Sequence, residues 1–241
     1  MILELFVPAL LAILPSYVWL LFFLKNDKNP EPNIRILATF LIGMLFAVPA
    51  FFTETGILAI VDLGSEEWPI CIASIFLLKI FIAVALIEEI FKYLSVKLFA
   101  FRHQEFDEPM DAPIYMMVSA LGFAAVENSL FLSAADWTKP EIPLALALIR
   151  FLGATFLHAL SSALFGCFIA LSFYHFKKRK RYFWTGLFLA TLLHGSYNFL
   201  IIGMQSYSQF LLLFVALLGV SFLLLPFFEK IKTLKSICKL N

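Results

Sequence analysis

Long apolar runs fill most of this sequence, and each run is long enough to cross a lipid bilayer as a single helix. A transmembrane helix needs about 20 apolar residues to span the hydrocarbon core. Of the 241 residues, 62% are hydrophobic, well above the roughly 45–50% of soluble domains. We therefore expect an all-α polytopic membrane bundle with about seven transmembrane helices, at residues 2–24, 34–61, 70–99, 113–135, 143–175, 182–203 and 207–228.

The charges between these runs predict how the helices are oriented. Basic residues concentrate in the first, third and fifth connectors and in the C-terminal tail, whereas the second connector contains acidic residues and no Lys or Arg. Because cytoplasmic connectors are enriched in Lys and Arg, we expect the N-terminus outside and the C-terminus in the cytoplasm. We interpret the basic run 177–181 as a topology anchor and not as a nucleic-acid patch. We expect residues 1–241 to form a single integral membrane domain.

Two acidic residues and one basic residue lie inside the third run. They are Glu88, Glu89 and Lys92, and a charge at membrane depth costs roughly 2.5–3.5 kcal/mol. Glu88 and Lys92 are four residues apart on one helical face, in the order that favours an ion pair. The second carboxylate is left uncompensated, which indicates a shared proton or a partner on another helix. A structural ion pair that pins neighbouring helices is the alternative to a reactive site.

The next three runs also carry ionisable or amide side chains inside their apolar stretches. Taken singly, each has an ordinary explanation, such as a hydrogen bond between helices, a basic side chain that reaches the membrane surface, or a satisfied core histidine. Apart from Glu54 in the second run, buried polarity is confined to the third to sixth runs. Such a distribution is typical of a bundle with a wet internal cavity, and we expect a catalytic core at about 70–203. The residues concerned are Glu127, Arg150, His158, His194 and Asn198.

These side chains admit several chemistries. A glutamate can take a proton from water, which then attacks a carbonyl, while His194 and Asn198 would stabilise the resulting oxyanion. Glutamate and histidine are also zinc ligands. The sequence, however, contains no HExxH signature and no two histidines at ligand spacing on one helix. We therefore expect no metal and no other cofactor, with zinc as the alternative.

Other functions also remain open from the residues alone. Ser161 and Ser162 lack the sequence context of a serine nucleophile. A proton-coupled transporter uses buried carboxylates and histidines too, and it is the main alternative to an enzyme. A non-catalytic scaffold that binds a partner helix is a third possibility. The sequence does not indicate an oligomeric state.

The order of the polar groups on successive runs resembles a known family. The PrsW family of intramembrane proteases is related to the type II CAAX prenyl endopeptidase and bacteriocin-processing group, whose pattern is two glutamates then Arg, Phe-x-x-x-His, and His-x-x-x-Asn. Lys92 and Glu127 stand here where that wider group has Arg and His, and both agree with PrsW itself. The resemblance covers roughly residues 75–200 and rests on Glu88-Glu89-x-x-Lys92, Phe123-x-x-x-Glu127, the stretch from Arg150 to His158, and His194-x-x-x-Asn198.

The resemblance implies an intramembrane endopeptidase of the prokaryotic cytoplasmic membrane that uses a glutamate-activated water. It implies a site-1 type cut in a single-pass membrane protein, such as an anti-sigma factor, with lipid and no nucleic acid as the other partner. Glu88 is then the base and Glu89 its supporting carboxylate, and Glu127 takes the place of a water-positioning histidine. The remaining expected site residues are His194 and Asn198 at the oxyanion, His158 without an assigned role, and Lys92, Phe123 and Arg150 in support.

The expected spans place the carboxylates of Glu88 and Glu127 at different depths in the membrane. At ~1.5 Å of rise per residue, Glu88 comes out about two helical turns nearer the cytoplasm than Glu127. Either the span edges differ from those above, or the third helix begins after Ile70. The second explanation would place an interfacial segment around Trp68 and Pro69.

Overall fold

The computed structural model describes residues 2–25, 30–67, 72–103 and 106–234, and every regular element within these ranges is helical. Two of the long helices are interrupted by π-helical segments, so that α3 continues through η1 into α4, and α6 continues through η2 into α7. The elements are α1 (Ile2–Leu24), α2 (Asn33–Glu67), α3 (Ile72–Leu78), η1 (Lys79–Leu86), α4 (Ile87–Phe99), α5 (Asp111–Ser133), α6 (Glu141–Ile149), η2 (Arg150–Thr155), α7 (Phe156–Tyr174), the 3-10 turn η3 (Phe176–Lys178), α8 (Arg179–Ile202) and α9 (Tyr207–Lys232).

Six of the seven expected spans are helices that are long and apolar enough to cross a membrane. The expected span at 70–99 is also helical, from Ile72 to Phe99. Its composition sets it apart, because it carries five charged residues: Lys79, Glu88, Glu89, Lys92 and Lys97. The all-α prediction is confirmed. Among the residues that the structure describes, six of the seven expected spans meet the criteria of length and apolarity for a membrane span, and the seventh does not.

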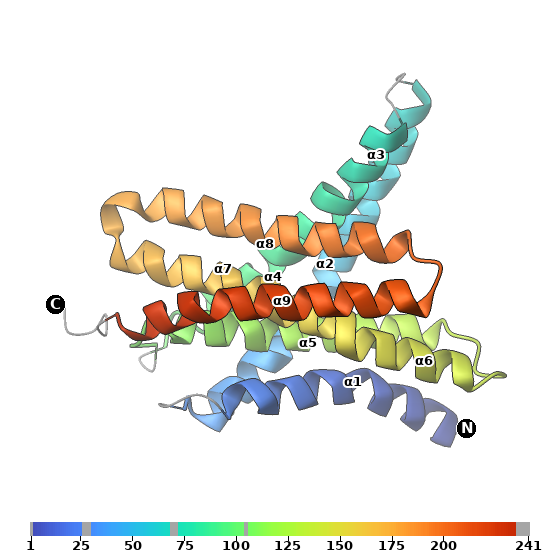
Figure 1. The fold of residues 1–241 in the computed structure, drawn as a ribbon, viewed down its shortest axis with the longest axis horizontal. Coiled ribbons are helices and arrows are strands. Elements are labelled where there is room, and N and C mark those ends of the chain that lie inside the picture. Colours follow the sequence, from blue (N-terminus) through green and yellow to red (C-terminus); the bar gives the residue numbers. More distant parts are fainter. Residues whose placement is uncertain (1, 26–29, 68–71, 104–105, 235–241) are drawn as a thin grey trace.

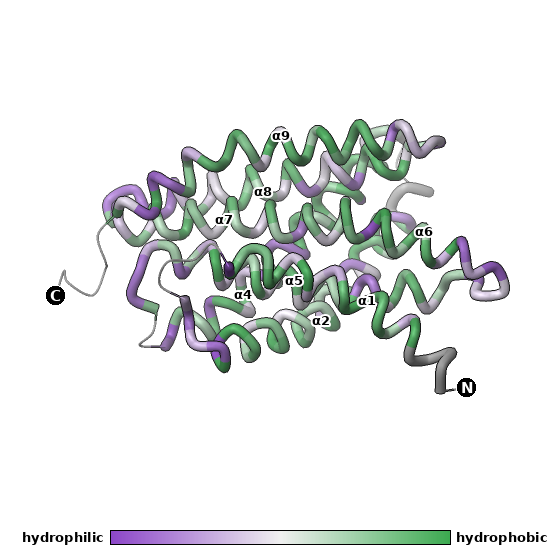
Figure 2. Tube along the Cα trace, turned by 60° about the horizontal axis from the view of Figure 1, so that its bottom comes forward, coloured by the Kyte–Doolittle hydropathy of each residue, from purple (hydrophilic) through white to green (hydrophobic). Residues whose placement is uncertain are grey.

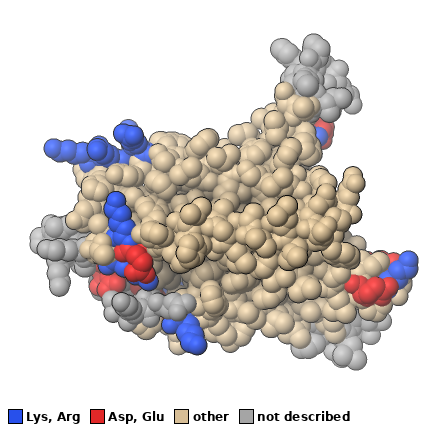
Figure 3. Space-filling view, in the orientation of Figure 1, with Lys and Arg blue, Asp and Glu red and all other residues tan. Residues whose placement is uncertain are grey.

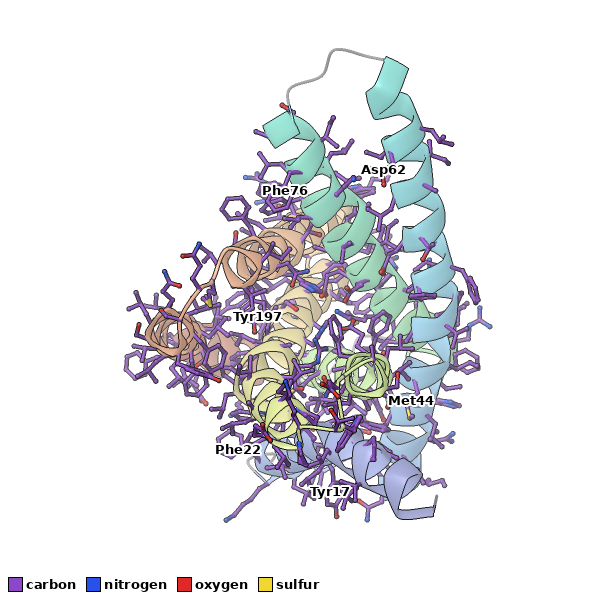
Figure 4. All side chains as sticks on the ribbon, turned by 90° about the vertical axis from the view of Figure 1, so that its right-hand side faces the viewer. Tyr17, Phe22, Met44, Asp62, Phe76 and Tyr197 are labelled. Carbon is purple, nitrogen blue, oxygen red and sulfur yellow. The ribbon has the colours of Figure 1, made fainter. Side chains whose placement is uncertain are left out.

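Most helices lie side by side, but α2 and α3 cross the bundle at a steep angle. Figure 1 shows α1, α5, α6, α7, α8 and α9 running along the long axis, while α2 and α3 lean away together. Figure 4 looks along the bundle, so those helices appear end-on, and α2 and α3 run across the view beside the labels Asp62 and Phe76. An ion pair between Asp62 of α2 and Lys79, the first residue of η1, joins the two leaning segments.

Glu88 and Glu127 meet in the structure despite the difference in depth expected for them, since both have an oxygen within 3.6 Å of a His158 ring nitrogen. The expected interfacial segment around Trp68 and Pro69 lies outside the described residues.

Helix α5 forms the centre of the bundle and packs against α1, α2 and α7. The crossing of α2 and α5 is very close, and two glycines make it possible. A Cβ atom at Gly43 would meet the backbone of Ser119, and a Cβ atom at Gly122 would meet the backbone of Phe40. These contacts bring the leaning helix α2 against the middle of α5, next to the polar residues of the bundle.

The surface has the character expected for a protein in a bilayer. On the face seen in Figure 3, the charged side chains gather at the ends of the bundle and near the tip of α2 and α3, with an uncharged surface between them. Figure 2 shows the same distribution along the chain, with most hydrophilic residues toward the two ends. Large apolar side chains such as Leu212, Phe222 and Leu223 on α9 are more than two-thirds exposed. Such an apolar belt is typical of a protein embedded in lipid.

Candidate active site

The charged groups of the third run follow directly after a π-helical segment. Glu88 and Glu89 are the second and third residues of α4, after η1 ends at Leu86. On the facing helix, Arg150 begins η2 and His158 is the third residue of α7. π-Helical insertions are rare and occur frequently at functional sites, because they shift the residues that follow around the helix. Both helices therefore present their polar side chains inward at the same place.

Lys92 lies at the centre of the polar cluster and contacts three of its members. Its ammonium nitrogen lies 2.9 Å from Glu89 Oε1, 3.2 Å from Glu88 Oε2 and 2.7 Å from His158 Nδ1. The whole residue is buried, and Nζ also stands 5.0 Å from the centre of the Phe123 ring. The expected pair between Glu88 and Lys92 is present, but Lys92 binds the second glutamate as well.

Glu89 is held on both of its oxygens. Ser162 Oγ donates to Oε2 at 2.9 Å, while Ser161 Oγ donates to Oε1 at 3.0 Å. His194 Nδ1 lies 3.0 Å from the same Oε1, which also accepts from Lys92. The sequence analysis considered the two serines as nucleophiles, for which they lack the context, and missed this role. A buried carboxylate with this many donors stays in place and has little capacity left for a new partner.

Glu88 has a more open environment than its neighbour. Its Oε2 lies 3.6 Å from His158 Nδ1 and 3.6 Å from His194 Nε2, which is longer than a hydrogen bond. Glu88 also lines a cavity of about 660 Å³. Of the two adjacent glutamates, Glu88 is therefore the one that can contact a molecule in the cavity.

Glu127 reaches the cluster from α5. Its Oε2 lies 3.2 Å from His158 Nε2 and 3.1 Å from Arg150 Nη2. Its Oε1 has no hydrogen-bond partner among the described residues, although that oxygen is buried. Arg150 is buried too, and its Nε donates to Asn128 Oδ1 at 2.5 Å. The alternative in which Arg150 reaches the membrane surface is therefore wrong, since its side chain belongs to the site.

Asn128 anchors this part of the cluster, and sequence reasoning did not single it out. Its Nδ2 donates to Thr155 Oγ1 at 3.1 Å and to the carbonyl oxygen of Ala12 at 3.2 Å. The amide thus connects α5 with η2 and with α1 while its oxygen holds Arg150. Only its position next to Glu127 could have indicated such a role.

The partners of the two histidines assign their tautomers. The Lys92 ammonium can only donate, so His158 accepts at Nδ1 and donates from Nε2 to Glu127. The fully bonded Glu89 carboxylate accepts from His194 Nδ1–H. In neutral His194, Nε2 then carries no proton, and its lone pair is directed toward Glu88.

The cavity joins the polar cluster to a largely apolar space. Its lining comes from α2, η1 and α4 on one side and from α5, α6, η2, α7 and α8 on the other. Asn198 lines it and makes no side-chain hydrogen bond to the part of the chain that the structure describes. Tyr197, labelled in Figure 4, lines it as well, and so does Glu54 on α2, which was noted in the sequence but not assigned to the site. Seven of the nine expected site residues therefore line one cavity. The other two, Lys92 and Glu89, contact the lining histidines His158 and His194, and the catalytic roles of all nine remain a prediction.

The cluster contains residues of the types that bind metal ions. Glu88, His158 and His194 each offer a ligand atom, and these atoms lie within 4.8 Å of one another. Glu127 and Glu89 orient the two histidines, as carboxylates commonly do behind metal-bound imidazoles. The ammonium of Lys92, however, contacts two of the three ligand atoms. With Lys92 in that position, the site does not fit a divalent cation.

Comparisons with known proteins identify the family of this chain. The model of a family described as PrsW family intramembrane metalloprotease matches residues 31–225. Protease PrsW of Geobacillus kaustophilus is 31% identical over 194 residues, which cover 80% of this chain and 79% of that protein. Protease PrsW of Halalkalibacterium halodurans is 33% identical over 188 residues, which cover 78% of this chain and 80% of that protein. No solved structure matches the chain.

Proposed function

The chain belongs to the PrsW family of intramembrane proteases, and on that premise we propose that it hydrolyses a peptide bond with a water molecule activated by Glu88. The observation that carries this proposal is the contrast between the two adjacent glutamates. Glu89 has both oxygens bound by protein donors, whereas Glu88 lines the cavity with His194 Nε2 nearby. The relatives are named proteases, which supports a membrane-embedded hydrolase over a proton-coupled transporter or a non-catalytic scaffold.

The proposed reaction follows the usual course of water-mediated hydrolysis. Glu88 takes a proton from water, and the oxygen adds to the carbonyl carbon of the scissile bond. The Asn198 amide donates to the oxyanion that forms, while His194 stays neutral, with Nδ1–H bound to Glu89 and Nε2 facing Glu88. Glu88 then returns its proton to the leaving nitrogen as the bond breaks. No step in this scheme requires a metal ion.

Glu127 is proposed to position the attacking water. Its Oε2 is fixed by Arg150 and His158, which leaves the unpaired Oε1 able to accept a hydrogen bond from a water molecule. Accurate positioning of the reacting groups supplies a large part of the rate enhancement of many enzymes. This role is the one that a histidine has in the wider protease group.

The shape of the cavity supports a cut in one half of the membrane. Its lining extends to Ala134 and Ile202, next to the connectors that follow α5 and α8. The basic segment 177–181 lies at the opposite end of the bundle. If that basic end faces the cytoplasm of a prokaryotic cell, with the N-terminus outside, the substrate is cut toward the outer face. A site-1 type cut in a single-pass membrane protein, such as an anti-sigma factor, fits this geometry.

The test compares cells that produce the wild type, Glu88→Gln or Glu141→Gln at matched membrane levels. Glu141 is exposed at the start of α6, so its variant controls for the loss of a carboxylate. We expect membrane-protein fragments in the wild type and in Glu141→Gln that are missing in Glu88→Gln. Identical fragment patterns in all three would contradict the proposal.

A further inference from the structure

Lys92 stands where the candidate metal ligands converge. Its Nζ contacts Glu88 Oε2 and His158 Nδ1, and these are two of the three atoms that could bind a metal ion. A tetrahedral zinc site has bonds of about 2.0–2.2 Å and therefore ligand atoms about 3.3–3.6 Å apart. Here the three ligand atoms lie within 4.8 Å of one another, so a modest inward movement would complete such a set.

The two histidines have the surroundings that histidine ligands have in metal sites. The two histidines come from different helices, α7 and α8, and each is oriented by a carboxylate on its far nitrogen. Such carboxylate–histidine pairs fix the ring and raise its basicity in metal sites. The one group that does not belong in a metal site is a buried ammonium with no acceptor function of its own.

The Lys92 ammonium and a divalent ion would compete for the same place in the cluster. Lys92 is buried against the carboxylates of Glu88 and Glu89, while the second buried cation, Arg150, is bound to Glu127. A divalent ion added beside Lys92 would bring two positive charges close together in a buried site, whereas without Lys92 the ion would face the carboxylates with no ammonium between them. Charges in low-dielectric surroundings are strongly coupled, so this difference decides whether an ion binds.

We propose that the Lys92 ammonium takes the place of a divalent metal ion in this site, and that Glu88, His158 and His194 bind zinc once Lys92 is removed. Lys92 then supplies from within the chain the positive charge that a zinc ion supplies in metalloproteases, and it keeps both adjacent glutamates in place. The inference rests on the proposed function only for the identity of the site, because it concerns metal binding and not cleavage.

The experiment measures zinc binding to purified full-length protein in detergent, after chelation and dialysis against a zinc buffer. The variants are the wild type, Lys92→Met, and Lys92→Arg, which keeps a positive charge. Zinc is counted as the amount lost when His194→Ala is added to each of them. We expect about one zinc ion per chain in Lys92→Met, bound at least about tenfold more tightly than in the wild type or in Lys92→Arg. Zinc should raise the Tm of Lys92→Met alone, by mass action.

Two results would overturn the inference. One is a wild type that binds a His194-dependent zinc ion as tightly as Lys92→Met does, and this arm requires no variant at position 92. The other is a folded Lys92→Met that binds none. If Lys92→Met does not fold, Lys92→Gln is used in its place, since glutamine keeps hydrogen bonding and removes the charge. Proteolysis is not part of either measurement, so failure of the proposed function would be seen separately, as a wild type that cleaves nothing.

Discussion

At the scale of single residues, two neighbouring glutamates have been given different environments by the helices around them. Glu89 is fixed by Lys92 and His194 and by serine hydroxyls, whereas Glu88 faces the cavity. Paired carboxylates in different surroundings commonly have different roles in an active site, so that one reacts and the other holds its neighbours in place. We assign the reacting role to Glu88 and the holding role to Glu89.

The holding role predicts the effect of removing the two serines. In Ser161→Ala/Ser162→Ala, Glu89 loses two donors, and each hydrogen bond to a charged group contributes about 1.5–3 kcal/mol. We expect a lower Tm and a kcat reduced at least about tenfold, because Glu89 would no longer be held in place to orient His194. Ser133→Ala removes an exposed hydroxyl that bonds only within its own helix turn, and it should change neither quantity. Wild-type kcat in the double variant would contradict the assignment.

At the scale of helices, the site depends on two inserted π-helical segments and on one close crossing. η1 and η2 direct the polar residues of two helices inward, and the crossing of α2 with α5 closes one side of the cavity. The glycine of α5 at this crossing leaves no room for a side chain. The position of α2 is therefore set by the absence of a methyl group.

This crossing predicts a clear effect for Gly122→Ala. The added Cβ would meet the backbone of Phe40, which cannot yield as a flexible side chain can. Overpacking of this kind costs about 1–3 kcal/mol. We expect a lower Tm and weaker proteolysis, as α2 is moved away from the cavity. Gly56→Ala on the same pair of helices is the control, since a Cβ there meets nothing within 4 Å. Equal Tm values for both variants would show that the crossing is not tight.

At the scale of the whole molecule, the charged ends and the uncharged belt define how the bundle lies in the membrane. The basic segment 177–181 and the connector that follows α5 lie at opposite ends of the bundle. The cavity lining extends toward the second of these ends. The side on which a substrate is cut therefore depends on which end faces the cytoplasm.

Labelling of single cysteines in intact cells tests this orientation. In a background without the native cysteines, Lys139→Cys should react with a membrane-impermeant thiol reagent, and Lys178→Cys should react only after the membrane is opened. The positive-inside rule predicts this result, because Lys178 belongs to the densest basic connector. The reverse pattern would place the cavity lining toward the cytoplasm and would exclude a cut near the outer face.

The sequence predicts much of this molecule, because charges inside apolar runs are conspicuous. Helix positions and the members of the polar cluster follow from that contrast. Ser161, Ser162 and Asn128 could not be found in this way, since small hydroxyls and amides are common wherever membrane helices pack. The π-helical segments leave no mark in composition, because they change hydrogen bonding and not residue type. The lean of α2 and α3 was equally hidden, since span length does not set tilt.

The most direct test of the account measures cleavage of an identified substrate by wild-type protein, Glu88→Gln and Glu141→Gln in liposomes, each with and without a metal chelator. Loss of a general base typically costs about 10²–10⁴-fold in rate. We predict a loss of this size for Glu88→Gln, with unchanged Tm, and no effect of the chelator on the wild type. A folded Glu88→Gln that cleaves at the wild-type rate, or wild-type activity that is lost to the chelator and restored by zinc, would contradict the account.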